Sequence, residues 1–280
     1  MTITGKAKLA GVMGWPISHS RSPRLHTYWL DHYKIDGAYV PLAVRPEDCA
    51  EMLRALPKLG FRGCNLTIPH KEIAFGVVDA LTDRAQRIGA VNTVIVQENG
   101  TLLGDNTDGF GFLENLRHGR PGFSAAAGPA VVLGAGGAAR AVLAALQEAG
   151  CPEIRLLNRS RDRAEALATA LPKAVQVDDW EQRDACLEGA SLLVNTTSLG
   201  MSGQPPLCLD LDALPIDGMV TDVVYAPLET DLLAQARRRG HPVVDGLGML
   251  LHQARPGFAA WFGQWPDVTE SVRTFVMRDL

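Results

Sequence analysis

The chain has 280 residues, of which 46% are hydrophobic and 21% charged, so its composition is globular and its length suits one large or two modest domains. Its 27 Lys and Arg residues against 31 Asp and Glu residues give a formal net charge of −4. This balance disfavours a nucleic-acid partner, because no excess positive charge is available to neutralise phosphates.

The cysteine pattern and the hydropathy predict the compartment. The chain has 5 cysteines, an odd number, and they form no C-x-x-C pair, which favours free thiols in a reducing environment. No apolar run approaches the ~18 residues that a membrane span needs, and residues 1–10 lack the apolar segment of a signal peptide. We therefore expect a cytoplasmic protein without a membrane partner.

In the first half of the chain, short apolar runs alternate with helical patterns. The patterns predict strands at 8–14, 38–44 and 63–68, helices at 22–34, 46–59 and 82–88, and a hairpin of strands 91–97 and 101–103. Ser22 and Pro23 are typical of an N-cap and a first helical residue. Glu98, Asn99 and Gly100 supply the hairpin turn.

The second half begins after residues 117–129, where several Gly and Pro residues indicate a domain boundary. Further strands are predicted at 130–133, 154–157, 192–195, 219–224 and 242–244, with helices at 137–149 and 161–170. Because strands alternate with helices, both halves are predicted to be α/β. A last helical region starts at Gly248, and Pro256 should break or kink it.

Residues 129–150 carry a dinucleotide-binding pattern. Gly134, Gly136 and Ala139 form G-x-G-x-x-A directly after an apolar strand and at the start of a helix. Gly134 permits a tight turn, Gly136 lets the backbone approach a pyrophosphate, and the helix N-terminus offers amide donors. The predicted contacts in this turn are Gly134, Ala135, Gly136, Gly137 and Ala138. A purely structural glycine turn is the alternative.

The end of the next strand predicts which dinucleotide binds. An NAD site would carry Asp or Glu there for the ribose hydroxyls, whereas this chain has Asn158, Arg159, Ser160 and Arg163. Guanidinium groups suit a 2′-phosphate, so the predicted cofactor is NADP. A solvated arginine cluster at a helix start is the alternative, although cations there are unfavourable without a nearby anion.

Four polar clusters follow predicted strands of the first half: residues 14–23, 65–71, 89–93 and 104–109. Ser18 and Ser20 could aim both hydroxyls one way if their segment is extended. Lys71 follows Pro69 at a predicted helix N-terminus, the unfavourable end for a cation, and Asp108 sits in a glycine-flanked turn. Each residue also has a structural interpretation, as turn, surface or satisfied core residue. The histidines show no metal-ligand spacing, so no metal is predicted.

Together with GAGGAAR at 134–140, NRS at 158–160 and GMLLHQA at 248–254, these clusters closely resemble the shikimate dehydrogenase family over essentially the whole chain. The resemblance implies NADP-dependent reduction of 3-dehydroshikimate to shikimate in aromatic amino acid biosynthesis. It implies Lys71 and Asp108 as the catalytic pair. It also implies a set of substrate contacts, namely Ser18, Ser20, Thr67, Lys71, Asn92, Asp108, Tyr225 and Gln253, and it adds Gly246 to the cofactor contacts. Cys64 and Leu66 depart from the commoner residues of the family, but both are apolar replacements and leave the implied roles unchanged.

The predicted architecture is α/β with two domains. Residues 1–116 form a substrate domain, residues 117–246 a Rossmann-like NADP domain, and residues 247–280 a helical segment that returns to the first domain. The expected partner is the small-molecule substrate, and a homodimer is compatible with the sequence. Two other functions stay open: a quinate/shikimate dehydrogenase that prefers NAD, and a non-catalytic nucleotide-sensing module. A methylene-tetrahydrofolate dehydrogenase fits less well, because the serine pair suits a small hydroxylated acid.

Overall fold

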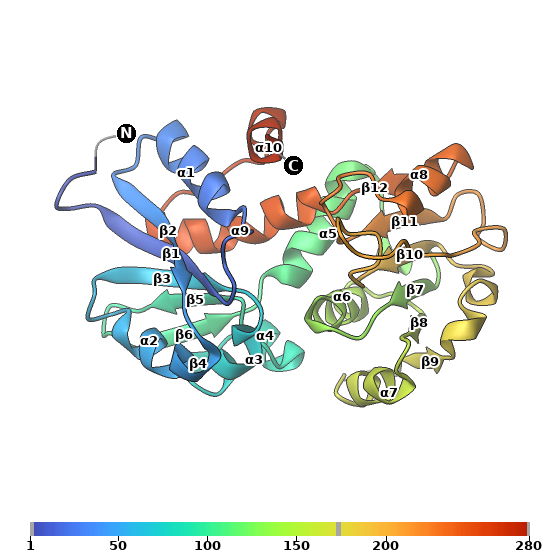
Figure 1. Ribbon diagram of the computed structural model, residues 1–280, viewed down its shortest axis with the longest axis horizontal. Coiled ribbons are helices and arrows are strands. Elements are labelled where there is room, and N and C mark those ends of the chain that lie inside the picture. The colour runs from blue at the N-terminus through green and yellow to red at the C-terminus, as the bar shows by residue number, and fades with distance from the viewer. Residues whose placement is uncertain (1–2, 172–174, 279–280) are drawn as a thin grey trace. The chain divides into compact units, whose positions relative to one another are not determined.

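The computed structural model describes residues 3–171 and 175–278, and these divide into two compact units (Figure 1). Unit 1 contains the chain up to Thr107 and again from Leu250, and unit 2 is the continuous stretch Asp108–Met249. The mixed α/β fold class predicted from the sequence is confirmed. The helix at 108–119 belongs to unit 2, although the predicted first domain extends to residue 116.

Unit 1 is built on one mixed sheet. Among the described residues its strand order is β2-β1-β3-β5-β6-β4. The strands are β1 (Lys8–Gly14), β2 (Gly37–Ala43), β3 (Phe61–Leu66), β4 (Ala80–Leu81), β5 (Thr93–Val96) and β6 (Leu102–Asp105). Strand β1 runs parallel to β2 and β3, while β5 is antiparallel to β3 and β6. The predicted hairpin is therefore confirmed, and the carboxyl ends of β1, β3 and β6 lie at the same edge as the start of β5.

Unit 1 also holds helices, two of which follow a threonine whose hydroxyl caps the first turn. They are α1 (Ser22–His32), η1 (Pro46–Asp48), α2 (Cys49–Ala55), α3 (His70–Phe75), α4 (Asp83–Ile88) and α10 (Glu270–Met277). The N-cap of α1 is Arg21, whereas the sequence predicted Ser22. Thr82 caps α4, since its hydroxyl accepts the amide hydrogen of Ala85, and α4 ends at Gly89 in the left-handed region.

Helix α9 (Leu247–Phe262) continues through Pro256, so of the break or kink expected there the break does not occur. An interior proline costs about 3 kcal/mol. Against this, the same helix fully buries Leu251, Ala254, Phe258 and Trp261, and each large apolar side chain contributes about 1.5–3 kcal/mol on burial. Packing therefore outweighs the local preference that the sequence shows.

Trp261 illustrates how closely α9 packs within unit 1. Its indole nitrogen donates to the carbonyl of Val94 at 3.0 Å. Gly63 on the neighbouring strand has φ +147°, and a Cβ there would lie 2.3 Å from Trp261 Nε1. Glycine is required at this position by both its backbone angle and the close approach of the indole.

Unit 2 is a doubly wound parallel sheet with the strand order β12-β11-β10-β7-β8-β9 among the described residues. The strands are β7 (Ala130–Leu133), β8 (Ile154–Leu157), β9 (Gln176–Asp178), β10 (Leu192–Asn195), β11 (Met219–Asp222) and β12 (Val243–Val244). The helices are α5 (Asp108–Gly119), η2 (Ala125–Ala127), α6 (Gly137–Glu148), α7 (Arg161–Thr169), η3 (Trp180–Gln182), η4 (Ala185–Leu187) and α8 (Asp231–Arg238). The chain leaves β7 toward β8 and β9 and then returns to β10, so β7 and β10 flank the switch point at which such sheets bind ligands.

Two apolar clusters cover the faces of this sheet. One includes Val132, Leu156 and Val194, and the other includes Val131, Leu157 and Leu193, so neighbouring residues of each strand point to opposite sides. Within residues 3–171 and 175–278, every helix is too short or too polar to cross a membrane.

Candidate active site

In unit 1, strand pairing brings the predicted site residues to one edge of the sheet. Thr67 follows β3, and its amide donates to the carbonyl of Met13 on β1 at 3.0 Å. Lys71 lies in the first turn of α3, as predicted, and its carbonyl accepts the amide hydrogen of Val91 at 2.9 Å. Asn92 immediately precedes β5 at the same edge. Thr67, Lys71 and Asn92 thus belong to neighbouring segments, although Asn92 lies well beyond the other two in the sequence.

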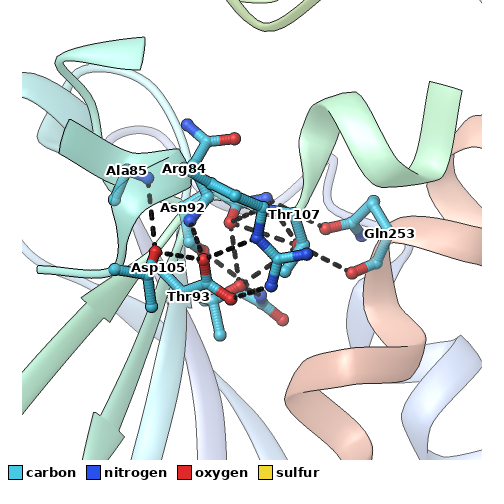
Figure 2. Close-up of polar contacts among 10 residues, drawn as sticks. Arg84, Ala85, Asn92, Thr93, Asp105, Thr107 and Gln253 are labelled. Atoms are coloured by element: carbon cyan, nitrogen blue, oxygen red, sulfur yellow. Dashed lines mark hydrogen bonds and ion pairs between the residues drawn. The ribbon is translucent and has the colours of Figure 1, made fainter. Parts of the chain in front are cut away.

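Asn92 lies at the centre of a buried hydrogen-bond network (Figure 2). Its Oδ1 accepts from the backbone amide of Thr107 and from the hydroxyl of Thr93, both at 2.8 Å. Its Nδ2 donates to Thr107 Oγ1 at 3.1 Å and to Gln253 Oε1 at 3.3 Å. Because a backbone amide can only donate, it fixes the carbonyl side of the amide group, and the NH₂ side faces Gln253.

Gln253 on α9 joins the same network. Its backbone carbonyl accepts from Thr107 Oγ1 at 2.8 Å, and its Nε2 donates to the carbonyl of Leu250 at 3.0 Å. Both sides of the Gln253 amide group are therefore defined by partners within unit 1. The structure brings Asn92 and Gln253 into direct contact.

Two residues that are not among the predicted site residues, Asn65 and Tyr39, support Asn92 through hydrogen bonds. Asn65 on β3 donates to the carbonyl of Asn92 at 3.2 Å and to Thr93 Oγ1 at 3.1 Å. Tyr39 on β2 donates in turn to Asn65 Oδ1 at 2.7 Å. A polar residue inside the apolar strand 61–66 was the available signal for Asn65, since an unpaired amide is costly to bury. Its long-range partner Tyr39 has no local signature.

The serine pair adopts a geometry different from the extended segment expected. Residues 17–20 form a turn closed by a 3.0 Å hydrogen bond from the Ser20 amide to the Ile17 carbonyl. Ser18 is exposed, and Ser20 Oγ accepts the amide hydrogen of Ser22 at 3.4 Å. Local turn bonding thus decides the backbone here. Both serines stay predicted substrate contacts.

In unit 2, Asp108 and Tyr225 are held by different elements. Asp108 is buried and begins α5, so it is a helix-start residue and not the turn residue expected from its flanking glycine. Tyr225 is half-buried in the segment after β11. The roles of both residues stay predictions.

Asp222 anchors the segment that carries Tyr225. Its Oδ1 accepts from Asn195 Nδ2 at 3.0 Å and from the Val224 amide at 2.9 Å, and its Oδ2 accepts from Thr230 Oγ1 at 2.8 Å. Burial disfavours the charged form and raises the pKa of Asp222 to about 6, although these three donors oppose the change.

The turn after β7 fits a dinucleotide phosphate. Gly134 has φ +106°, and a Cβ there would lie 2.7 Å from Thr196 Oγ1. At Gly136 and Gly137 an added Cβ would meet open space, so these positions leave room for a ligand. Gly136 is the N-cap of the 12-residue helix α6 and makes no side-chain cap hydrogen bond. Backbone amides at such a helix start are suitable donors for a pyrophosphate.

The arginines near the end of β8 differ in their interactions. Arg161 forms ion pairs with Glu165 at 2.8 Å and Asp179 at 2.6 Å. Arg159 and Arg163 are exposed and have no ion-pair partner among the described residues. Asn158 Nδ2 donates to the Ser160 carbonyl at 2.8 Å and shapes the turn between them. Arg159 and Arg163 are thus the cations available to a 2′-phosphate.

Gly246, the remaining predicted cofactor contact, lies in a tightly packed backbone crossing. A Cβ there would lie 2.6 Å from the backbone of Val223 and from the carbonyl of Val224. The glycine lets the chain after β12 pass close to the segment after β11. Its contact with the cofactor stays a prediction.

The parallel sheet and the glycine turn of unit 2 define a dinucleotide-binding α/β protein. Residues 12–94 match the model of the shikimate dehydrogenase substrate binding domain, and residues 122–201 match that of shikimate / quinate 5-dehydrogenase. A shikimate dehydrogenase (NADP(+)) of Paramagnetospirillum magneticum is 62% identical over 275 residues, covering 98% of this chain and 100% of the relative. The chain belongs to the shikimate dehydrogenase family.

Two solved structures show the same similarity. Shikimate 5-dehydrogenase from Thermus thermophilus, in complex with NADP(H) and shikimate, has a TM-score of 0.86 and 39% identity, covering 98% of this chain and 100% of that one. Quinate dehydrogenase from Corynebacterium glutamicum, in complex with NAD, has a TM-score of 0.90 and 32% identity, covering 96% and 99%. The resemblance stated from the sequence is confirmed.

Proposed function

We propose that this protein catalyses the reversible, NADPH-dependent reduction of 3-dehydroshikimate to shikimate, a step of aromatic amino acid biosynthesis. The observation that carries the proposal is the 62% identity, over nearly the whole chain, to a relative named as an NADP(+) shikimate dehydrogenase. The Asn92–Gln253 pair and the open glycine turn provide the polar groups that such a reaction needs in each unit.

NADP, when bound, supplies or accepts the hydride. The residues proposed to hold it are the turn from Gly134 to Ala138, the segment from Asn158 to Arg163, and Gly246. The amides at the start of α6 would bind the pyrophosphate, and Arg159 and Arg163 would bind the 2′-phosphate through charge-assisted hydrogen bonds.

Lys71 and Asp108 are proposed to handle the proton. As the ketone carbon of the substrate gains a hydride, negative charge develops on its oxygen, and the Lys71 ammonium stabilises that oxygen and donates a proton to it. Asp108 would accept hydrogen bonds from Lys71 and from an adjacent substrate hydroxyl. We assign the proton transfer to the two residues together, because interacting groups titrate as a pair.

The polyol is proposed to be bound by neutral side chains. A ligand hydroxyl that enters between Asn92 Nδ2 and Gln253 Oε1 accepts from the first and donates to the second, which replaces their 3.3 Å contact without leaving a polar atom unpaired. Thr67 would contact a further hydroxyl. Ser18, Ser20 and Tyr225 would bind the carboxylate.

Initial rates with two acids and two cofactors test this proposal. Shikimate and quinate are each assayed with NADP⁺ and NAD⁺ by nicotinamide absorbance. We expect the highest kcat/KM for shikimate with NADP⁺. A preference for NAD⁺ would contradict the role of Arg159 and Arg163, a preference for quinate would assign the other substrate, and NADP⁺ binding without turnover would indicate a nucleotide sensor.

The cellular setting follows from the same proposal. We take the compartment to be the cytoplasm, where the reduced nicotinamide pool and free cysteines are compatible with this chemistry. The assembly is proposed to be a homodimer, which light scattering of the purified protein tests directly.

A further inference from the structure

The support of the candidate site extends to an ion pair that none of the predicted roles includes. Asp105 is the last residue of β6, and Arg84 lies in the first turn of α4. The Asp105 side chain is only 7% exposed, and the Arg84 side chain is 38% exposed. An almost buried carboxylate needs strong partners, because removal from water penalises its charged form.

Three residues donate hydrogen bonds to the Asp105 carboxylate. Arg84 donates through Nε to Oδ1 at 3.1 Å and through Nη2 to Oδ2 at 2.5 Å, a two-pronged contact (Figure 2). The hydroxyl of Thr82 donates to Oδ1 at 2.6 Å. The backbone amide of Asn106 donates to the same oxygen at 2.8 Å. The carboxylate therefore ties the start of α4 to the end of β6.

The Asn106 contact matters because only residues 106 and 107 join β6 to α5. Asn106 Nδ2 donates to the Ala90 carbonyl at 3.0 Å, and the Thr107 amide donates to Asn92 Oδ1 at 2.8 Å. Asp108, the next residue, begins α5. The Asp105 carbonyl also accepts the amide hydrogen of Asn92 at 3.0 Å. Two of these contacts reach Asn92, which has a proposed role in the reaction.

We propose that Arg84 and Asp105 are positioning residues: their two-pronged ion pair fixes the 106–107 link, and through Thr107 it sets the amide orientation of Asn92. This inference rests on the proposed function. Neither residue is among the proposed substrate contacts. A looser link lets the Thr107 amide leave Asn92 Oδ1, and the Asn92 amide group can then rotate and present the wrong atoms to a hydroxyl.

The inference predicts how substitutions differ. Asp105→Asn keeps the size of the side chain but replaces one acceptor oxygen with an NH₂ group, so the two-pronged contact with Arg84 is lost. Arg84→Lys keeps the charge but cannot form the two-pronged contact. We expect kcat/KM for shikimate to fall by roughly 10-fold to 100-fold in Asp105→Asn, the cost of misplacing a substrate-positioning group by about 1 Å, and by less in Arg84→Lys.

The experiment compares these variants with a matched control. Glu114→Gln removes the carboxylate of an exposed ion pair with Arg117 on α5, and it should leave all rates unchanged. The KM for NADP⁺ should stay within about twofold in every variant, because the cofactor residues are not part of this network. In Arg84→Ala, added guanidinium should restore part of the lost kcat/KM, since the exposed site admits a small planar cation, whereas ammonium should not.

Three outcomes overturn the inference. The first is unchanged kcat/KM for shikimate in folded Asp105→Asn. The second is a loss of kcat/KM that is equal for shikimate and NADP⁺ and that the folded fraction of the variant fully accounts for. The third is no rescue by guanidinium. If Asp105→Asn does not fold, Arg84→Lys and the rescued Arg84→Ala decide the question. Absence of turnover by the wild-type protein would refute the proposed function itself, whereas turnover that these substitutions leave unaffected refutes only the positioning role.

Discussion

His26 in α1 makes unit 1 sensitive to acid. Its side chain is fully buried, and neither ring nitrogen has a hydrogen-bond partner among the described residues. The ring stacks on Tyr39 with centroids 3.8 Å apart and an interplanar angle of 3°. Burial without a compensating partner disfavours the imidazolium and lowers the pKa of His26 from 6.5 to about 3.

The magnitude follows from this pKa difference. Below pH 6.5 the imidazole of the unfolded chain binds a proton, whereas that of the folded chain stays neutral down to about pH 3. The stability that neutral His26 contributes is therefore complete above pH 6.5 and declines as the pH falls. At about 1.4 kcal/mol per pH unit, the loss is about 2 kcal/mol at pH 5 and approaches about 5 kcal/mol near pH 3.

Urea unfolding at pH 7.5 and pH 5 measures this effect. Tryptophan fluorescence reports mainly on unit 1, which contains Trp15, Trp29, Trp261 and Trp265. We expect the wild-type protein to lose about 2 kcal/mol more between these pH values than His26→Phe does. A constant packing cost of the larger ring cancels in this double difference.

A control on the same helix completes the design. His32 is exposed, so His32→Phe should keep the wild-type pH dependence. If His26→Phe and the wild-type protein lose stability in parallel, the imidazole does not resist protonation and the reasoning fails.

Three further substitutions test the proposed roles. Lys71→Ala should lower kcat by roughly 10²-fold to 10⁴-fold with little change in the KM for shikimate, and near-native kcat in steady-state assays would refute its assignment. Arg159→Ala should raise the KM for NADP⁺ by roughly 10-fold or more and leave the KM for NAD⁺ unchanged. Arg161→Ala should change neither KM, because the Arg161 guanidinium is already paired, and equal effects of the two substitutions would contradict the 2′-phosphate role. Asp222→Asn should gain about 2.5 kcal/mol relative to wild type between pH 4 and pH 7, because the raised pKa of about 6 lets protonated Asp222 stabilise the wild-type fold at pH 4, and this stabilisation is lost by pH 7. Urea unfolding that shows no such gain would rule out an uncharged Asp222.

Much of unit 2 could be predicted from the sequence, because its strands are short apolar runs bounded by glycine and polar turns. The predicted ranges 130–133, 154–157 and 192–195 are the observed β7, β8 and β10. The glycine turn after β7 was equally accessible, since its spacing, its preceding strand and its following helix are all local features.

The supporting residues of unit 1 could not be predicted in the same way. Asp105 looks like an ordinary turn residue, and only the fold shows that Arg84 lies against it. Asn65 and Tyr39 likewise meet across strands that are distant in sequence. The continuity of α9 through Pro256 has no local signature for the same reason, since the packing that maintains the helix comes from strands and helices elsewhere in unit 1. Local patterns predict elements, whereas the partners of buried polar groups depend on tertiary structure.

The interrupted path of unit 1 determines the order in which the protein can mature on the ribosome. When residues up to Thr107 have emerged, Phe258 and Trp261 have not yet been synthesised, and the space left at Gly63 has no indole to fill it. The apolar face of the nascent sheet that α9 covers therefore stays exposed while the uninterrupted stretch from Asp108 to Met249 is translated. That stretch contains unit 2 and can fold as a whole. The half of the molecule that is made first is therefore the half that is finished last.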